Sequence, residues 1–437
     1  MAKSSKKAAK DKSIHDPIHG LVTVTPLMVS IMDTPEFQRL RDLKQLGAAH
    51  FVYPSATHTR LEHSLGVGHL AKIMMKSLQR NQPILGITER DVEITQVAAL
   101  VHDIGHGPYS HLYDGYVIRK GEDEHEVRGC KIFRRMASSY HLSLTTEEVD
   151  RIVNMIDPPE RLKNDWKYQV VANKVSQVDV DKLDYIQRDS HRLGLKFGGE
   201  YSRLLSEARV CAVARPNQPT GTYQLGWPEK MQFELFSLFC TRYRLHKQVY
   251  NHHAVRAHEF HIANILRGLQ EQGVPFQQLT DSVITCQLHP GPDALRERLL
   301  IAHRKIPKLV GELTTSATSS SAVEPNPRVI IDLILDKVKI GFSSGEKNNP
   351  LHGIYYFDRD APSCDAGNGS FPVGYGLDPA ETSFCVPRTH QETIVRLYTM
   401  NTSARGVKEA RSWWAEYKGE QLKRMSRLSS GSSAREN

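Results

Sequence analysis

The spacing of apolar residues predicts that most of this chain is helical. Over positions 145–157, apolar residues recur three and four places apart, which is the repeat of one helix face. These residues are Val149, Ile152, Val153 and Ile156. Residues 229–272 form the longest helical candidate, and its expected core positions include Phe233, Phe236 and Cys240.

A further helical pattern ends in a polar motif. Thr88, followed three residues later by Asp91, has the spacing of a capping box, and an apolar stripe comes after it. The stripe consists of Val92, Val97, Leu100 and Val101. We expect this helix to end just after His102 and Asp103, because two glycines and a proline follow closely.

The C-terminal part of the chain has a mixed pattern. We expect loops at 314–327 and 361–376, which are rich in small residues and prolines. Residues 328–342 alternate like a strand, 354–357 are a short apolar stretch, and 390–417 are expected to be helical.

These patterns predict a mainly α fold, a helical core with a smaller α+β C-terminal lobe. The expected boundaries are a disordered basic arm at 1–13, the core at 14–310, the lobe at 311–420 and a disordered tail at 421–437. We expect no separate domain within so short an N-terminal lead.

The composition of the chain is that of a globular protein rather than a membrane or secreted one. The chain has 437 residues, 24% charged and 39% hydrophobic, as in globular proteins. No apolar run approaches the ~18 residues of a membrane span, and no secretory signal precedes the core. Six scattered cysteines without a CxxC pair favour free thiols and an intracellular location, cytoplasm or nucleus. The net charge of +8 suits polyanionic partners, although several lysines lie in the tails.

Histidines and carboxylates gather around the predicted helix end. His63, His102 and Asp103 supply imidazole and carboxylate groups, and Asp181 is the best candidate for a further ligand. Such a set suits zinc, iron or manganese, and an open position would leave room for a water nucleophile. The alternative is a core histidine with carboxylates that only cap helices.

Two later segments carry polar stripes. If 175–189 is helical, four polar residues lie on adjacent parts of one face, with Lys182 beside them. They are Asp181, Tyr185, Arg188 and Asp189. The stripe in 229–272 consists of Arg242, His246, Tyr250 and His253. Next to a metal, such faces would form a phosphate pocket, and the alternative is that both are solvated surfaces.

The order His…His-Asp…Asp resembles the HD phosphohydrolase superfamily. The sequence around these residues resembles one family of that superfamily, the SAM-and-HD-domain deoxynucleoside triphosphate (dNTP) triphosphohydrolases, without their SAM domain. The matching strings are HDPIHG at 15–20, DTPEFQRLR at 33–41, RLEHSLGVG at 60–68, and the segments 102–115, 179–189 and 242–250. The resemblance implies that 14–310 is an HD core and that 311–420 serves regulation and oligomerisation.

The resemblance implies a role for each matching residue. The metal ligands would be His63, His102, Asp103 and Asp181, with Mg on the triphosphate. His111 would be the general acid, oriented by Asp114 and His125. The triphosphate would contact Arg60, His106, Lys182, Tyr185 and Arg242. Gln45 and Asp189 would bind the 3′-hydroxyl. Leu46 and Tyr250 would crowd the 2′ position of the sugar and so exclude ribonucleotides. The implied reaction converts dNTP and water into deoxynucleoside and triphosphate.

The resemblance also implies allosteric control by GTP and dNTPs through a homotetramer. The guanine-nucleotide site would involve Asp33, Gln38 and Arg41, although Asp33 followed by proline is also an ordinary helix start. A neighbouring dNTP site would involve Val52, Tyr53, Arg203, Lys230, Arg304, Lys308 and Lys347. The sequence departs from the family at Pro228, His253 and His15, so we expect the control to differ more than the catalysis.

Two alternatives stay open. One is another HD phosphohydrolase acting on a monophosphate, a cyclic nucleotide or another phosphate ester, although Arg60, Lys182 and Arg242 are more cations than a monophosphate needs. The other is a nucleotide-gated protein that binds single-stranded nucleic acid with weak or no hydrolysis.

Overall fold

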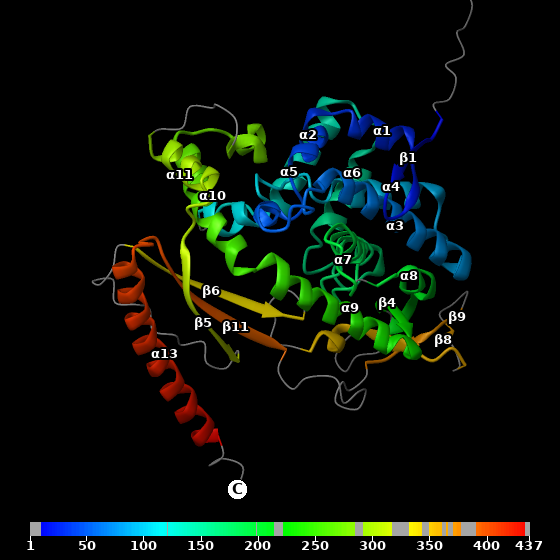
Figure 1. Ribbon diagram of the computed structural model, residues 1–437. Coiled ribbons are helices and arrows are strands. Elements are labelled where there is room, and N and C mark those ends of the chain that lie inside the picture. Colours follow the sequence, from blue (N-terminus) through cyan, green and yellow to red (C-terminus); the bar gives the residue numbers. More distant parts are fainter. Residues whose placement is uncertain are drawn as a thin grey trace, which may run out of the picture.

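The computed structural model confirms a mainly α architecture (Figure 1). It describes residues 10–119, 121–197, 199–213, 222–284, 292–316, 332–342, 349–360, 364–365, 370–376 and 390–432. Helices of the core surround a buried apolar centre that also takes in side chains from the N-terminal hairpin. That hairpin pairs β1 (Lys12–Asp16) with β2 (Gly20–Val24).

The core is built from helices of very different length. They are α1 (Pro26–Met32), α2 (Pro35–Gln38), α3 (Arg60–Asn81), α4 (Glu89–Val101), α5 (His125–Ser139), α6 (Thr146–Ile156), α7 (Val180–Arg192), α8 (Ser202–Glu207), α9 (Gln232–Leu245), α10 (His253–Glu271) and α11 (Pro292–Ala302). Two π-helical turns, η4 (Tyr113–Val117) and η7 (His246–Tyr250), interrupt this series. The 3-10 turns include η8 (Phe276–Gln278) and η9 (Asp281–Ile284).

The centre of the core is α3, which packs against α4 and α7. Its contact with α7 is close because Gly66 has no side chain: a Cβ there would lie 2.0 Å from Asp184 Oδ1. The capping box of α4 is confirmed, with Thr88 and Asp91 bonded reciprocally, and α4 ends at Val101, two residues earlier than predicted. The N-terminus of α3 and the C-terminus of α4 therefore bring their polar residues into the interior.

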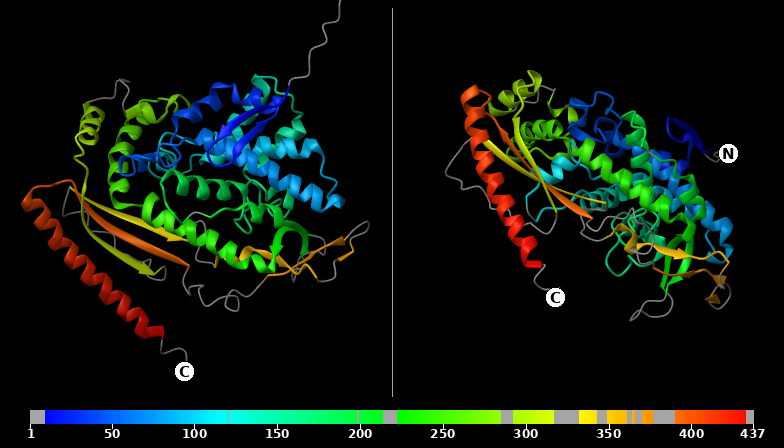
Figure 2. Two further views of the ribbon diagram at one scale, coloured as in Figure 1. Left: turned by 45° about the vertical axis from the view of Figure 1, so that its right-hand side comes forward. Right: turned by 60° about the horizontal axis from the view of Figure 1, so that its bottom comes forward.

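Two sheets lie beyond the helical core. Strands β5 (Lys308–Ser316), β11 (Gln391–Thr399) and β6 (Leu333–Gly341) form an antiparallel sheet with β11 in the centre. The long helix α13 (Ala404–Ser432) runs along this sheet (Figure 2). A four-stranded sheet has the order β10 (Val373–Gly374), β3 (Arg209–Val213), β4 (Thr222–Pro228) and β7 (Tyr355–Phe357). Strands β8 (Cys364–Asp365) and β9 (Ser370–Phe371) pair separately.

Two secondary-structure predictions in the C-terminal lobe are wrong. Residues 391–399 form a strand rather than the start of a helix, because β5 and β6 bond to both of its edges. The tail expected to be disordered continues as α13 through Ser432, and 433–437 lie outside the described residues. The predicted strand at 328–342 is confirmed over 333–341.

Other secondary-structure predictions are confirmed only in part, because the boundaries of the elements differ. The helix predicted over 229–272 is interrupted at η7, and Phe233 is wrong as a core residue because its side chain is 69% exposed. Strand β5 reaches into the loop expected at 314–327, the rest of which lies outside the described residues. The short strands β8, β9 and β10 fall within the loop expected at 361–376. Strand β1 takes in the last two residues of the expected arm.

Candidate active site

Three helix ends bring the four predicted metal ligands together. His63 lies in the first turn of α3, His102 and Asp103 follow the last turn of α4, and Asp181 lies in the first turn of α7. The Nε2 atoms of His63 and His102 lie 2.9 and 3.4 Å from Oδ1 of Asp181. The same two atoms lie 3.6 and 3.4 Å from the carboxylate of Asp103.

The outer nitrogen of each imidazole has a partner of its own. His63 Nδ1 lies 2.8 Å from Asp184 Oδ2, and His102 Nδ1 lies 2.7 Å from the carbonyl oxygen of Ala99. When Nδ1 carries the proton and donates it outward, Nε2 is left with a lone pair that points into the cluster. Both rings are therefore oriented for metal binding.

Sequence reasoning missed Asp184, which is fully buried. Its carboxylate also contacts His19 Nε2 at 2.6 Å and accepts two hydrogen bonds from Arg188, at 2.8 and 3.0 Å. Arg188 in turn donates to Asp16 at 2.8 Å. Arg188 thus belongs to this buried network and not to the polar face on which it was placed, so that prediction is wrong.

The donor set fits a divalent transition metal. His102 Nε2 is buried and makes no hydrogen bond within the described part of the chain. Two imidazoles and two carboxylates are ligands that zinc, iron and manganese accept. Burial opposes the charged form of His63, but hydrogen bonds with Asp181 and Asp184 outweigh it and raise its pKa to about 10. A metal must therefore displace a proton from this cluster.

Three further histidines line the same cavity. The rings of His106 and His125 stack at 3.9 Å, and the ring of His111 lies 5.2 and 5.7 Å from them, edge on. His125 Nδ1 lies 2.7 Å from Asp114 Oδ2, and Arg128 donates to the other oxygen of Asp114. Asp114 contacts His125 directly, whereas the contacts of His111 with these groups are those of its ring with the rings of His106 and His125.

Cations and a tyrosine line the wall beside the metal cluster. Arg60 is buried, donates to Asp103 and to Ser110 Oγ, and its Nη2 atom has no partner within the described residues. Lys182 Nζ lies 3.8 Å from Asp179, and Arg242 Nη1 donates to the carbonyl of Gly341 at 3.1 Å. Burial raises the pKa of Tyr185, which therefore stays a neutral hydroxyl.

Asp189 and Tyr250 line another part of the cavity. Asp189 is buried, with its two oxygens 2.7 Å from His58 Nε2 and 2.5 Å from the Tyr250 hydroxyl. The π-helical turn η7 lets both His246 and Tyr250 face the cavity, whereas His253 does not line it. Such π turns often occur at functional sites.

All these groups line one cavity of about 530 Å³. Every residue predicted to bind metal or substrate lines it, and of the predicted catalytic residues only Asp114 does not. His58 had no predicted role, and its contact with Asp189, 131 residues away in the chain, leaves no local sequence signal.

The residues predicted for allosteric control fall into separate surface groups. Gln38 accepts a hydrogen bond from Arg41 at 2.6 Å, next to Asp33 at the end of α1. Arg304 donates to the carbonyl of Phe51, adjacent to Val52 and Tyr53. In a third group, Arg203 pairs with Glu234, close in sequence to Lys230. Among the described residues no hydrogen bond or ion pair joins these groups, Lys308 begins β5, and Lys347 lies outside the described residues.

The fold and the four-ligand cluster define an HD-domain protein. A family model described as "HD domain" matches residues 60–189, which span His63 to Asp189. The chain is 31% identical to the "Deoxynucleoside triphosphate triphosphohydrolase SAMHD1 homolog" of Dictyostelium discoideum, over 90% of this chain and 78% of that protein. It is 28% identical to the "Deoxynucleoside triphosphate triphosphohydrolase SAMHD1" of Gallus gallus, over 93% of this chain and 75% of that one.

The chain therefore belongs to the SAMHD1 family. A "Putative HD domain-containing protein L394" of Acanthamoeba polyphaga mimivirus is 29% identical over 78% of this chain and 84% of its own length. Within the described residues, no helix combines the length and apolar content needed to cross a membrane.

Proposed function

We propose that this protein is a metal-dependent dNTP triphosphohydrolase. The observation that carries the proposal is that one cavity joins the cluster of His63, His102 and Asp181, with Asp103 beside it, to the cations that line the neighbouring wall. The reaction is dNTP plus water giving deoxynucleoside plus inorganic triphosphate. The printed names of the SAMHD1 relatives support this substrate class.

The metal would be iron, zinc or manganese, held by the four ligands, with Mg accompanying the triphosphate. When bound, such a metal lowers the pKa of a coordinated water and supplies a nucleophile near neutral pH. Asp184 and the Ala99 carbonyl keep the two imidazoles aimed at it. Arg60, Lys182 and Arg242 bind the phosphates through charge-assisted hydrogen bonds and stabilise charge that develops in the transition state.

His111 is the general acid of the proposed reaction. The water gives one proton to the solvent and its oxygen bonds to the α-phosphorus, the bond from phosphorus to the 5′-oxygen breaks, and His111 gives its own proton to that 5′-oxygen. Desolvation within the cavity and the positive charge of Arg60 lower the pKa of His111 to about 4, so the free enzyme holds it neutral at pH 7. Bound triphosphate offsets the charge of Arg60, which raises the pKa and lets His111 carry the proton it donates.

The sugar end selects deoxynucleotides. Asp189 and Gln45 bind the 3′-hydroxyl, and Leu46 and Tyr250 occupy the space that a 2′-hydroxyl would need. The hydrogen bond of 2.5 Å between Tyr250 and Asp189 keeps the aromatic ring in place. Specificity of this kind comes from exclusion of the larger substrate.

GTP and dNTPs would act as effectors of a homotetramer inside the cell. Asp33 can accept both donors of the guanine edge, and Arg41, with Gln38 beside it, can meet phosphate. The second site would use Val52, Tyr53, Arg203, Lys230, Arg304, Lys308 and Lys347. Pro228 and His253 replace basic residues of the family there, so we expect a weaker or altered response to effectors.

The test is a chromatographic assay of the purified protein with each dNTP, with and without GTP. The double variant His102→Ala, Asp103→Ala serves as the blank. Deoxynucleoside and triphosphate released only by the wild type support the proposed reaction, and a dependence on GTP together with a rise in mass supports the regulation. No product with any dNTP and metal would reject the enzyme, and salt-sensitive binding of single-stranded nucleic acid would then favour the binding protein.

A further inference from the structure

The loop that carries His111 has an unusual backbone. Tyr109 and Ser110, the two residues before it, both have a φ of +59°. Left-handed conformations of residues other than glycine persist where the surroundings hold them, and they cluster at functional sites. Gly47 packs against this turn so closely that a Cβ there would lie 2.7 Å from the Tyr109 carbonyl oxygen. The position of His111 therefore depends on contacts from outside its own segment.

The carboxylate of Asp281 provides those contacts. Its Oδ1 accepts a hydrogen bond of 2.7 Å from the backbone N–H of Tyr109, and its Oδ2 accepts one of 2.7 Å from the backbone N–H of Lys44. The Tyr109 hydroxyl donates to the Asp281 carbonyl oxygen at 3.0 Å. Asp281 is only 3% exposed, so each N–H has lost its access to water. One side chain thus joins the segment of His111 to that of Gln45 and Leu46.

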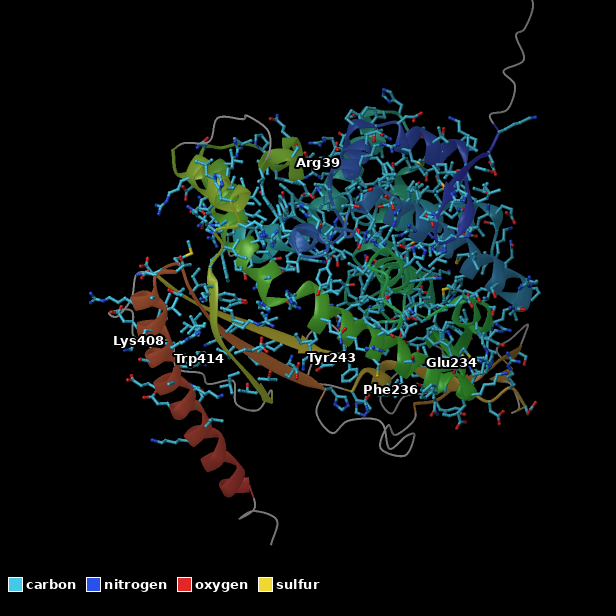
Figure 3. The ribbon with its side chains drawn as sticks, viewed as in Figure 1. Arg39, Glu234, Phe236, Tyr243, Lys408 and Trp414 are labelled. Carbon is cyan, nitrogen blue, oxygen red and sulfur yellow. The ribbon has the colours of Figure 1, made fainter. Side chains whose placement is uncertain are left out.

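The segment that carries Asp281 is itself anchored to the active-site loop. Arg39, labelled in Figure 3, donates to the carbonyls of Phe276 and Leu279 at 3.3 and 2.9 Å. A third nitrogen of Arg39 donates to the carbonyl of His106 at 2.8 Å. The 276–284 segment is therefore held against the loop at two points, by Arg39 at His106 and by Asp281 at Tyr109.

Asp281 does not line the cavity and cannot touch substrate. Lys44 Nζ lies 4.0 Å from Asp281 Oδ2, at the limit of an ion pair. Ser110, between Tyr109 and His111, completes the connection: its hydroxyl donates to the Lys44 carbonyl at 2.9 Å and accepts from Arg60 Nε at 2.8 Å. Arg60 is also held by its hydrogen bond to Asp103, so movement of the turn would displace chiefly His111.

We propose that Asp281 is a positioning residue that holds the imidazole of His111 at the leaving 5′-oxygen. The proposal rests on the proposed function, because it assigns Asp281 to the acid step of that reaction. Asp281→Asn is the informative change: the amide has almost the same shape but only one acceptor atom, so Tyr109 or Lys44 would face an N–H group. The loop would then sample other positions without loss of the metal cluster.

The experiment compares dATP with an analogue in which sulfur replaces the bridging 5′-oxygen. A thiolate leaves without a proton, so only the oxygen substrate needs the acid. We expect Asp281→Asn to lower kcat for dATP at least about tenfold, within the range that a positioned acid contributes, and to change kcat for the analogue by less than about threefold. His111→Gln sets the full size of this difference, and metal content is measured in each variant.

Two further variants keep the test decisive. Thr145→Ala removes a helix cap of α6, away from the loop, and should lower the melting temperature without changing the ratio of the two rates. Tyr109→Phe removes only the hydroxyl bond to Asp281 and should change the ratio in the same direction by a smaller factor. If Asp281→Asn does not fold, the ratio of the two rates in Tyr109→Phe tests the positioning role instead.

An equal fall for both substrates, or an unchanged ratio, would overturn the positioning role. Failure of the wild type to release triphosphate from dATP would instead reject the proposed function, and the positioning role with it.

Discussion

The Nδ1 atom of His63 lies 2.8 Å from Oδ2 of Asp184, a carboxylate buried where α7 packs against α3. Asp181, one turn earlier on α7, reaches the opposite nitrogen of the same imidazole at 2.9 Å. A single helix therefore supplies both a ligand of the cluster and the group that orients another ligand. This arrangement depends on the close approach of the two helices at Gly66.

Asp184→Asn should weaken metal binding by about 10–100-fold, the usual effect of removing the partner of a metal-bound histidine. The amide can no longer pair with His19, His63 and Arg188 in the same way, so His63 loses its fixed orientation. Metal content after dialysis and competition with a chelator measure the change. Activity should return when metal is added in excess.

The control for this change is Glu62→Gln. Glu62 also lies in the first turn of α3, but it pairs with Arg192 at a partly exposed site. The Glu62→Gln variant should have a metal affinity within about twofold of the wild type, because such exposed ion pairs contribute little. Unchanged affinity in Asp184→Asn would show that Asp184 serves only the packing of α3 against α7.

The pH dependence of the reaction should differ between free enzyme and complex. Because an acid must be protonated to act, the rate falls as pH rises through the pKa of His111. In the free enzyme that pKa is lowered to about 4, by desolvation within the cavity and by Arg60. We expect the fall in kcat/KM, which reports free enzyme, to occur at lower pH than the fall in kcat, which reports the complex with triphosphate bound.

Arg60→Gln tests the cause of this shift. Removal of the positive charge should move the fall in kcat/KM to higher pH, while KM for dNTP rises because a phosphate contact is lost. Profiles of kcat/KM recorded from about pH 4 to about pH 9 cover the range in which a histidine titrates. A profile unaltered by the substitution would show that desolvation, and not Arg60, lowers the pKa of His111.

Enlarging the sugar end should admit ribonucleotides. Leu46→Ala and Tyr250→Ala remove the side chains expected to crowd the 2′ position, so the ratio of kcat/KM for dATP over ATP should fall at least about tenfold. Tyr250→Phe is the matched control: it keeps the ring but loses the hydrogen bond to Asp189. It should raise KM for dATP and retain the preference for deoxyribose. If Leu46→Ala and Tyr250→Ala still reject ATP, exclusion must come from other groups.

Gly311→Ala should destabilise the C-terminal lobe. A Cβ at Gly311 would lie 2.0 Å from Trp414 Nε1, on the face where α13 packs against β5. Overpacking of this kind costs about 1–3 kcal/mol of the free energy of unfolding, measured by urea denaturation. Gly419→Ala, on α13 with nothing within 4 Å of the added Cβ, should instead stabilise by about 0.5–1 kcal/mol. Equal effects of both changes would contradict the close contact with Trp414.

The sequence by itself determined the features that are local. The helix over 146–156, the capping box at Thr88 and, to within two residues, the end of α4 follow from periodicity and from residues a few places apart. The ordered histidines and carboxylates likewise indicated a metal site, because the chemistry of a ligand depends on residue type.

Only the tertiary structure decided which faces of these elements meet. Residues 391–399 are a strand because partners far away in the sequence bond to both edges. Arg188 points to Asp16 and not to the cavity, and Asp281 reaches Tyr109 from 172 residues away. The spacing of apolar residues predicts a helix but not the elements that pack against it. The groups that orient the metal ligands and the acid are therefore brought into place only when α3, α7 and the 276–284 segment pack together.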